Sequence, residues 1–453
     1  MRRIVTVLVC SFAPLAAVAS LMLVACSDDP RPPIDDAATT EASLPEAATP
    51  VDAGDPDARD PFDGRDEPVV CDASVCVTEL VAGEHHFCAR TSDGKVRCWG
   101  DDAKGQRGLA PSDAGVDAAA DGGGGDASKP TVTTLGGITQ ISAAGNTTCA
   151  RAEDGGVLCW GGNEAGDLGR GGDAGSDDLR HPVPARVVIE PAARVDVGER
   201  SSCATTAPGK VICWGEGPAP AELGLPVTRT AAGLDTGFAL ARDGTLLTWG
   251  EVAGGAGVLS GRISSVTPTP LASPVQGLSS ISSFAVSGPT PGRIPPGTIP
   301  GSPLPPSNQH ACAVMKGEIH CWGKSERGAL GSGLPDAVIP LPTYARLATK
   351  AYAQQLAAGG ETTCARLTDS TVTCTGENAR GQLGTGMTGP FSSTFVPAST
   401  LLGRAVQVAV ARESVCALMQ GGEVACWGGN AHGELGLGAP DQRPHPSATK
   451  VPF

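Results

Sequence analysis

The sequence predicts an all-β protein built from one repeated unit, and three observations support this prediction. The first is a hairpin pattern in which two cysteines flank a turn that contains glycine, as in Cys149 to Cys159. The second is its recurrence at a period of roughly 50 residues with about four strands per unit, which indicates a propeller or a solenoid. The third is composition: 62 glycines and 38 prolines, with 4% aromatic residues, suit short strands and tight turns rather than a helical bundle.

The repeated hairpin predicts where disulfides form. Both Cys149 and Cys159 lie equally far from Asp154, in a turn that ends in glycine, so an antiparallel register places the two thiols opposite each other. Another copy has Phe238 and Thr248 at the cysteine positions, and this joint loss leaves no cysteine elsewhere without a partner. We therefore expect each pair to close within its own hairpin: Cys88 with Cys98, Cys149 with Cys159, Cys203 with Cys213, Cys312 with Cys321, Cys364 with Cys374, and Cys416 with Cys426.

The cysteine content also predicts the compartment. Cys71 and Cys76 precede the first full repeat, and we expect them to pair with each other at the edge of the domain. Sixteen cysteines, mostly at hairpin spacing, indicate an oxidising environment. Zinc binding by these cysteines is the alternative, but the sequence contains no Cys-x-x-Cys pair. We expect disulfides, and no metal or other cofactor.

The N-terminus carries export signals. Met1-Arg2-Arg3 and an apolar run to Leu23 form the charged and hydrophobic parts of a signal peptide. The run ends in Leu23-Val24-Ala25-Cys26, which resembles the lipobox of a bacterial lipoprotein. That resemblance implies that residues 1–25 are removed and that Cys26 is lipidated; an ordinary cleaved signal or an uncleaved anchor is the alternative. Ser27 after the cysteine favours the outer membrane, by analogy with sorting rules.

The segment 26–70 is rich in Asp, Ala and Pro and shows no strand alternation. Such a segment buries too little apolar surface to offset the entropy of ordering, so it predicts a disordered tether. Residues 71–453 then form the folded domain.

The order of signals inside each unit resembles the repeat of the regulator of chromosome condensation (RCC1) family, in the cysteine-paired form of secreted bacterial proteins. These signals are Ala-Gly, then Cys-Ala, a turn with glycine, Cys-Trp-Gly, and a Gly-x-Leu-Gly turn such as Gly166 to Gly169. The resemblance implies a seven-bladed β-propeller over residues 71–453. Two departures stand out: Thr375 replaces the tryptophan of the sixth repeat, and a Pro-rich insert at 284–307 extends the fifth.

The two ends of the domain suggest how the ring closes. Pro446 to Val451 resembles the Pro-x-x-Val strand that opens other units, and no Ala-Gly strand follows it. Val77 to Gly83, at the other end, supplies such a strand. The sequence therefore predicts one sheet that combines strands from both termini, an arrangement that removes free edges.

Tryptophan and histidine positions have structural explanations. One tryptophan per repeat at one strand position is explained by burial between blades; an exposed stacking platform for glycans or bases is the alternative. His85 and His86 precede Cys88 at a repeat position, and His432 lies near a Gly-x-Leu-Gly turn. For all three we expect structural hydrogen bonds rather than metal coordination.

Charge and motifs narrow the function. The net charge is −15 with no cluster of Lys and Arg, which argues against binding to nucleic acid. The sequence contains no Gly-x-Ser-x-Gly, His-Glu-x-x-His or phosphate-binding loop, so we expect no catalytic residues. The nucleotide-exchange activity of nuclear RCC1 proteins does not fit an acidic, exported chain.

Two functions follow from these patterns. The first is an exported, lipid-anchored and monomeric scaffold that binds a protein or glycan at the cell envelope through its loops. The second is an extracytoplasmic hydrolase or lyase that acts on glycans with loop carboxylates. We favour the scaffold because no catalytic motif supports the enzyme.

Overall fold

In the computed structural model of the chain, the described residues are 62, 67–109, 129–133, 135–170, 175–220, 222–250, 258–262, 269–292 and 307–453. The chain divides into two compact units, residues 1–58 and 59–453, and the repeats lie in the second. The predicted signal peptide, Cys26 and most of the predicted tether lie outside the described residues. Within the described ranges, no helix has the length and apolar character that a membrane span requires.

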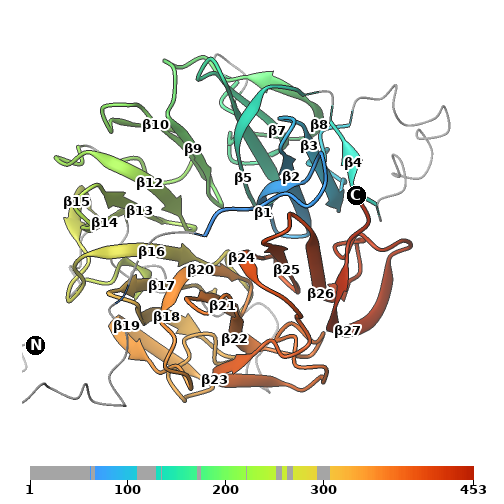
Figure 1. Cartoon of the computed structure of the whole chain (residues 1–453). Helices are drawn as coiled ribbons and strands as arrows, with labels where there is room; N and C mark the ends of the chain where they lie inside the picture. The colour runs from blue at the N-terminus through green and yellow to red at the C-terminus, as the bar shows by residue number, and fades with distance from the viewer. Residues whose placement is uncertain are drawn as a thin grey trace, which may run out of the picture. The chain divides into compact units, whose positions relative to one another are not determined.

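The described part of the second unit is all-β and forms a seven-bladed propeller, as predicted (Figure 1). Each blade is an antiparallel sheet whose strands follow one another in the sequence. The blades are β1–β4, β5–β8, β9–β11, β12–β15, β16–β19, β20–β23 and β24–β27, which we number 1 to 7. The strand bounds of blades 1 to 3 are β1 Val77–Ala82, β2 His86–Thr91, β3 Val96–Gly100, β4 Thr131–Val132, β5 Ile138–Ala144, β6 Thr147–Ala152, β7 Val157–Asn163, β8 Asp177–Arg186, β9 Arg194–Val197, β10 Ser201–Thr205 and β11 Val211–Gly215.

Blades 4 to 7 repeat this order, and the first strand of every blade lies nearest the centre of the ring (Figure 1). A short 3₁₀ turn, η1 Val258–Ser260, lies between the third and fourth strands of blade 4. The strand bounds are β12 Val227–Ala232, β13 Thr236–Ala241, β14 Leu246–Gly250, β15 Thr269–Pro274, β16 Ile281–Val286, β17 His310–Met315, β18 Glu318–Ser325, β19 Ala337–Ala345, β20 Ala353–Gly359, β21 Thr362–Leu367, β22 Val372–Glu377, β23 Phe391–Pro397, β24 Ala405–Val410, β25 Ser414–Met419, β26 Val424–Asn430 and β27 Asp441–Lys450.

The cysteine hairpin forms the middle two strands of a blade. In blade 2, Cys149 on β6 is the register partner of Cys159 on β7, and the turn between them uses Gly155 at a φ of 80°, a backbone conformation that glycine adopts without strain. The seven disulfides expected from the spacing are all present, including the pair at the edge of the domain: Cys71–Cys76, Cys88–Cys98, Cys149–Cys159, Cys203–Cys213, Cys312–Cys321, Cys364–Cys374 and Cys416–Cys426.

The repeat tryptophan joins each blade to the one before it. Its indole Nε1 donates a hydrogen bond to a backbone carbonyl in the loop after the third strand of the preceding blade; Trp160 donates to Gln106 O at 2.9 Å. Five of the six indoles are fully buried, so these tryptophans belong to the blade core, as predicted. The other donor–acceptor pairs are Trp99 to Glu434 O, Trp214 to Asp167 O, Trp249 to Pro218 O, Trp322 to Leu259 O and Trp427 to Gln382 O.

The sixth repeat replaces this contact with two residues. Thr375 Oγ1 donates to Gly328 O at 2.9 Å in the turn of blade 5. The space that an indole would fill is occupied by the ring of Phe395 from β23, which lies against Gly331 and is 3% exposed. The loss of the tryptophan at Thr375 is therefore compensated within the same blade.

The prediction that one sheet combines strands from both termini is wrong. Val77–Ala82 is β1, the innermost strand of blade 1, and Asp441–Lys450 is β27, which pairs only with β26 of blade 7. The Pro-x-x-Val strand is the last strand of its blade rather than the first, so the final blade is complete within its own stretch of sequence.

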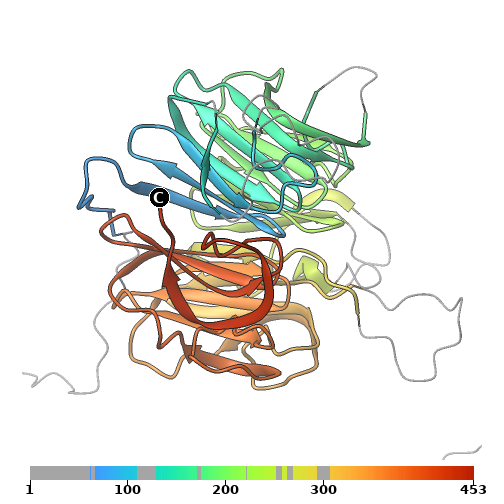
Figure 2. The same cartoon turned by 90° about the vertical axis from the view of Figure 1, so that its right-hand side faces the viewer.

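The ring is closed by the same indole contact that joins five of the other six pairs of neighbouring blades. Trp99 Nε1 of blade 1 donates to Glu434 O of blade 7 at 2.7 Å, and Trp99 packs with Leu435 and Val451 in one apolar cluster. The Phe453 ring at the end of the chain lies edge-on to Trp99, with 5.6 Å between the ring centroids. Figure 2 shows this red end of the chain beside the blue first sheet.

A second set of contacts links the inner strands around the centre. In most blades a polar side chain that follows the β-bulge of the first strand bonds to the backbone of the next blade; Gln407 Oε1 accepts from Leu80 N, and its amide donates to Leu80 O. Blade 4 instead places the Arg229 guanidinium 5.1 Å from the centroid of the Phe284 ring. The remaining links are Glu79 to Ile141, Gln140 to Val195, Asp196 to Thr230, Ser283 to Leu356 and Gln355 to Val408.

Candidate functional site

Two cavities meet on one face of the ring. The first, of about 810 Å³, runs along the inner strands of all seven blades. The second, of about 370 Å³, lies over blades 2 and 3, and both cavities are lined by Glu84, Ala144, Gly145 and Glu199. This face carries the loops between the first and second strands and the loops after the third strands, and we call it the mouth face.

Carboxylates dominate the lining of the second cavity. Its charged residues are five acids and a single guanidinium, that of Arg200. The acids come from loops of three blades, and the ring brings them together although 132 residues separate Glu84 from Glu216 in the sequence. We call this set the acidic mouth: Glu84, Glu164, Asp167, Glu199 and Glu216.

Three of these acids have cationic partners. Arg200 Nη2 donates to Glu216 Oε2 at 2.7 Å, and Lys104 Nζ lies 3.2 Å from a Glu164 oxygen. Arg412 of blade 7 pairs with Glu84 of blade 1.

Asp167 and Glu199 differ, because neither carboxyl group has a hydrogen-bond or ion-pair partner among the residues that the structure describes. Asp167 is 5% exposed, and its Oδ1 is buried without a partner. Burial, with the charge of Glu164 nearby, raises the pKa of Asp167 to about 7. Burial, with the charges of Glu84 and Asp167, raises the pKa of Glu199 to about 7 as well. The acidic mouth therefore contains two groups that titrate near neutral pH.

The β3–β4, β7–β8 and β16–β17 connections, which contain irregular inserts in the sequence, begin on the same face. The Pro-rich insert at 284–307 begins in β16 and lies between β16 and β17, and its residues Gly288, Pro289 and Thr290 line the central cavity. The inserts near 110–130 and 170–180 lie in the β3–β4 and β7–β8 connections, which leave the ends of β3 and β7 on this face. Residues 110–128, 171–174 and 293–306 lie outside the described residues.

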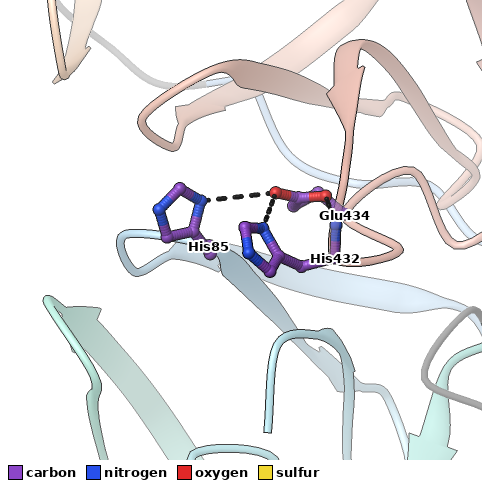
Figure 3. Close-up of side chains that lie close together, drawn as sticks. All are labelled: His85, His432 and Glu434. Atoms are coloured by element: carbon purple, nitrogen blue, oxygen red, sulfur yellow. Dashed lines mark hydrogen bonds and ion pairs between the residues drawn. The ribbon is translucent and has the colours of Figure 1, made fainter. Parts of the chain in front are cut away.

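A second cluster lies where blade 7 meets blade 1 (Figure 3). His85 Nδ1 is 3.3 Å and His432 Nδ1 is 3.0 Å from the same oxygen, Glu434 Oε1. The two imidazole centroids are 4.4 Å apart. Burial opposes ionisation of Glu434, but hydrogen bonds from His432 and His85 outweigh it and lower the pKa of this carboxyl to about 2. The hydrogen bond between His432 and Glu434 also raises the pKa of His432.

The structural role expected for His86 is present in the structure. His86 Nε2 lies 2.8 Å from Thr148 Oγ1 of the next blade, and the two residues are fully buried. His310 and Thr363 make the same contact at 2.7 Å between blades 5 and 6. Burial lowers the pKa of both histidines to about 4, so they remain neutral at physiological pH. His85 and His432 also make hydrogen bonds, but they share one carboxylate.

Asp167 and Glu434 share one position in the sequence repeat, which no catalytic motif covers. Asp167 and Glu434 both occupy the variable position of the Gly-x-Leu-Gly turn, where the equivalent turns have Gln106, Ala329 and Gln382. Two of these five turns therefore have a carboxylate at this position, but the repeat pattern does not show which acids meet in the ring.

Comparisons with known proteins agree with this architecture. A profile of the regulator of chromosome condensation (RCC1) repeat matches residues 77–106, 138–167 and 353–382. The ultraviolet-B receptor UVR8 of Arabidopsis thaliana is 25% identical over 395 residues, which cover 81% of this chain and 80% of the receptor.

Solved structures show the same fold. Prp20p from Saccharomyces cerevisiae matches with a TM-score of 0.64 at 18% identity, over 84% of this chain and 88% of that protein. Human WBSCR16 matches with a TM-score of 0.58 at 18% identity, over 72% of this chain and 85% of that protein.

Seven disulfides indicate that this propeller folds in an oxidising environment outside the cytoplasm. The chain thus carries RCC1 repeats and is an RCC1-like seven-bladed β-propeller, a scaffold fold for protein interactions.

Proposed function

We propose that this protein is an exported, lipid-anchored scaffold at the cell envelope that binds a partner through the mouth face of its propeller. The observation that carries this proposal is the acidic mouth, where five carboxylates and one guanidinium line a cavity of about 370 Å³. Above a pH of about 7, when Asp167 and Glu199 are ionised, the five carboxylates outnumber their three cationic partners. An excess of charge of one sign in a concave surface attracts ligands of opposite sign. The partner that fits is a protein segment that presents Lys or Arg.

Two further features support a binding role. The inner strands and tryptophans tie the blades together, so the loops of the mouth face stand on a rigid ring. Related propellers also bind proteins: Prp20p has been studied for its binding to Gsp1p and histones, and it has been crystallised with Kap60. The charge of the mouth selects basic protein segments over neutral glycans as ligands.

The test uses the full-length protein and a fluorescent oligolysine peptide, with a neutral peptide of equal length for comparison. We expect oligolysine to bind, with an affinity that falls as salt rises because exposed charges are screened. Replacing Glu164, Glu199 and Glu216 by Gln should weaken binding at least about tenfold, which corresponds to about 1.4 kcal/mol. A matched triple variant, Glu190→Gln with Asp243→Asn and Asp369→Asn, replaces the same number of acidic residues on the opposite face and should bind as the unchanged protein does. Equal loss in both variants, or no binding at all, contradicts the proposal.

The lipid anchor is tested separately. Cys26→Ser should move the protein from the membrane fraction to the soluble fraction, because acylation requires the thiol. Retention of Cys26→Ser in the membrane would contradict lipidation and leave the binding proposal intact.

A glycan hydrolase is the second candidate, and one observation favours it. Asp167 and Glu199 line the same cavity, and the pKa of each is raised to about 7, so protonated and ionised carboxyl groups coexist there at neutral pH. Glycoside hydrolysis uses one carboxylic acid and one carboxylate. Hydrolysis of a member of a glycan panel by the unchanged protein, together with its loss in Glu199→Gln, would favour the hydrolase over the scaffold function.

A further inference from the structure

The cluster at the junction of blades 7 and 1 contains more than its turn requires. In the turn of blade 1, Gln106 Oε1 accepts a hydrogen bond from Lys104 N at 2.8 Å, and Gln382 accepts from Arg380 N at 2.8 Å in blade 6. Glu434 Oε2 accepts from His432 N at the same distance. An amide oxygen thus closes this turn elsewhere in the ring, and the negative charge at position 434 serves no purpose in the turn itself.

The side chains around Glu434 also differ from those at the other junctions. At the junction of blades 1 and 2, Gln106 meets Asn146, which occupies the position of His85. At the junction of blades 7 and 1, a buried carboxylate meets two imidazoles, one from each blade. One ligand atom from each of His85, His432 and Glu434 lies within 4.8 Å of the other two.

We propose that His85, His432 and Glu434 form a binding site for a divalent transition-metal ion, with zinc as the best fit. Imidazole nitrogen and carboxylate oxygen are the donors that zinc prefers alongside thiolate. Bonds of about 2.0–2.1 Å in a tetrahedral arrangement place neighbouring donor atoms roughly 3.3 Å apart. The 3.3 Å and 3.0 Å between the Glu434 oxygen and the two imidazole nitrogens match this spacing.

The surroundings hold the three groups in place. Trp99 Nε1 fixes the backbone of Glu434 through its carbonyl oxygen, and Asn430 Oδ1 accepts from Leu435 N. On the far side of His85, a Glu84 oxygen lies 3.9 Å from Nε2, which is an ion-pair distance rather than a hydrogen bond. His432 is 42% exposed at its side chain, so an ion can enter from solvent and water can complete its coordination.

The site joins distant parts of the chain. His85 belongs to blade 1 and Glu434 to blade 7, and 349 residues separate them. Because no strand crosses this junction, an ion held by both blades would link the first and last blades directly. A bound ion should therefore stabilise the ring as well as occupy the site.

The experiment measures zinc binding by calorimetry, with the metal-free full-length protein at pH 7.5 in a buffer that does not bind metal. We expect one ion per chain in the micromolar range or tighter, together with a higher melting temperature. Glu434→Gln should fold, because glutamine fills this place in blades 1 and 6, and it should lose at least about 100-fold in affinity, since changes that only reorient a ligand cost about 10–100-fold.

His85→Asn gives an independent test, because Asn146 is the residue at this position in blade 2. The matched control is His445→Asn, which removes another histidine that lies 3.1 Å from a carboxylate in blade 7 but has no second imidazole beside it in the described part of the chain. It should bind zinc as the unchanged protein does. The proposal would be overturned if the unchanged protein did not bind zinc. It would also be overturned if Glu434→Gln and His85→Asn bound zinc as tightly as the unchanged protein does.

Discussion

The unpartnered carboxyl group of Asp167 predicts an unusual dependence of stability on pH. Its pKa is about 7 in the folded protein against an ordinary value of 3.8. The folded state therefore holds this proton more tightly than the unfolded state, and the stabilisation is complete below the ordinary pKa and lost as the pH rises through about 7. The difference between the two values corresponds to on the order of 4 kcal/mol of unfolding free energy between pH 4 and pH 8.

The replacement Asp167→Asn removes the titration and keeps the size of the side chain. We expect the unfolding free energy of the variant to fall less than that of the unchanged protein as the pH rises, by up to about 4 kcal/mol over this range. An imperfect fit of the amide would change the unfolding free energy by the same amount at every pH, so it would not alter how the unfolding free energy depends on pH.

The assay is urea unfolding with the disulfides intact, at half-unit steps from pH 4 to pH 8.5. Asp336→Asn is the control, because Asp336 is exposed and lies outside the acidic mouth. Parallel profiles for the unchanged protein and Asp167→Asn would show that this carboxyl group titrates normally, and the reasoning from burial would then be refuted.

Three further changes test how the ring is held together, each by the midpoint of urea unfolding. Gln407→Ala leaves the backbone N–H and C=O of buried Leu80 without partners and should cost about 1–3 kcal/mol; an unchanged midpoint would mean that this link contributes nothing. Phe395→Ala empties the space that an indole fills in other blades and should cost about 3–5 kcal/mol, whereas a loss under 1 kcal/mol would show that the blade collapses around the gap. Cys88→Ser with Cys98→Ser opens a bridge between residues 10 apart and should cost up to about 3 kcal/mol, and a midpoint equal to that of the unchanged protein would contradict that value.

The local part of this fold was accessible from the sequence. Asp154-Gly155 fixes a turn, and the turn fixes which residues face each other across two strands. The pairing of Cys149 with Cys159 therefore followed from this spacing together with the joint loss of both cysteines at Phe238 and Thr248. The tryptophan positions followed in the same way, because one buried residue per repeat at one strand position implies contact between blades.

The closure of the ring was predicted incorrectly because it depends on long-range pairing. Pro446 to Val451 carries the same pattern whether it opens a blade or completes one, and only the pairing of β27 with β26 decides between these roles. A repeat pattern gives the order of the strands but not the point at which one sheet ends and the next begins.

The acidic mouth was beyond sequence analysis for a related reason. Glu84, Asp167 and Glu199 belong to three different blades and meet only because the ring is closed. Their pKa values depend on burial, which no spacing encodes. His85 and Glu434 likewise meet across the junction of the first and last blades, and each residue taken alone resembles a structural one.

The likeness of most blade junctions has a consequence for the connectivity of the chain. Because blades 7 and 1 meet through the same indole contact and the same kind of inner-strand link as most other pairs, the ring requires no particular starting point. A circularly permuted gene, with the native ends fused by a short linker and new ends placed between any two blades, should encode the same folded ring.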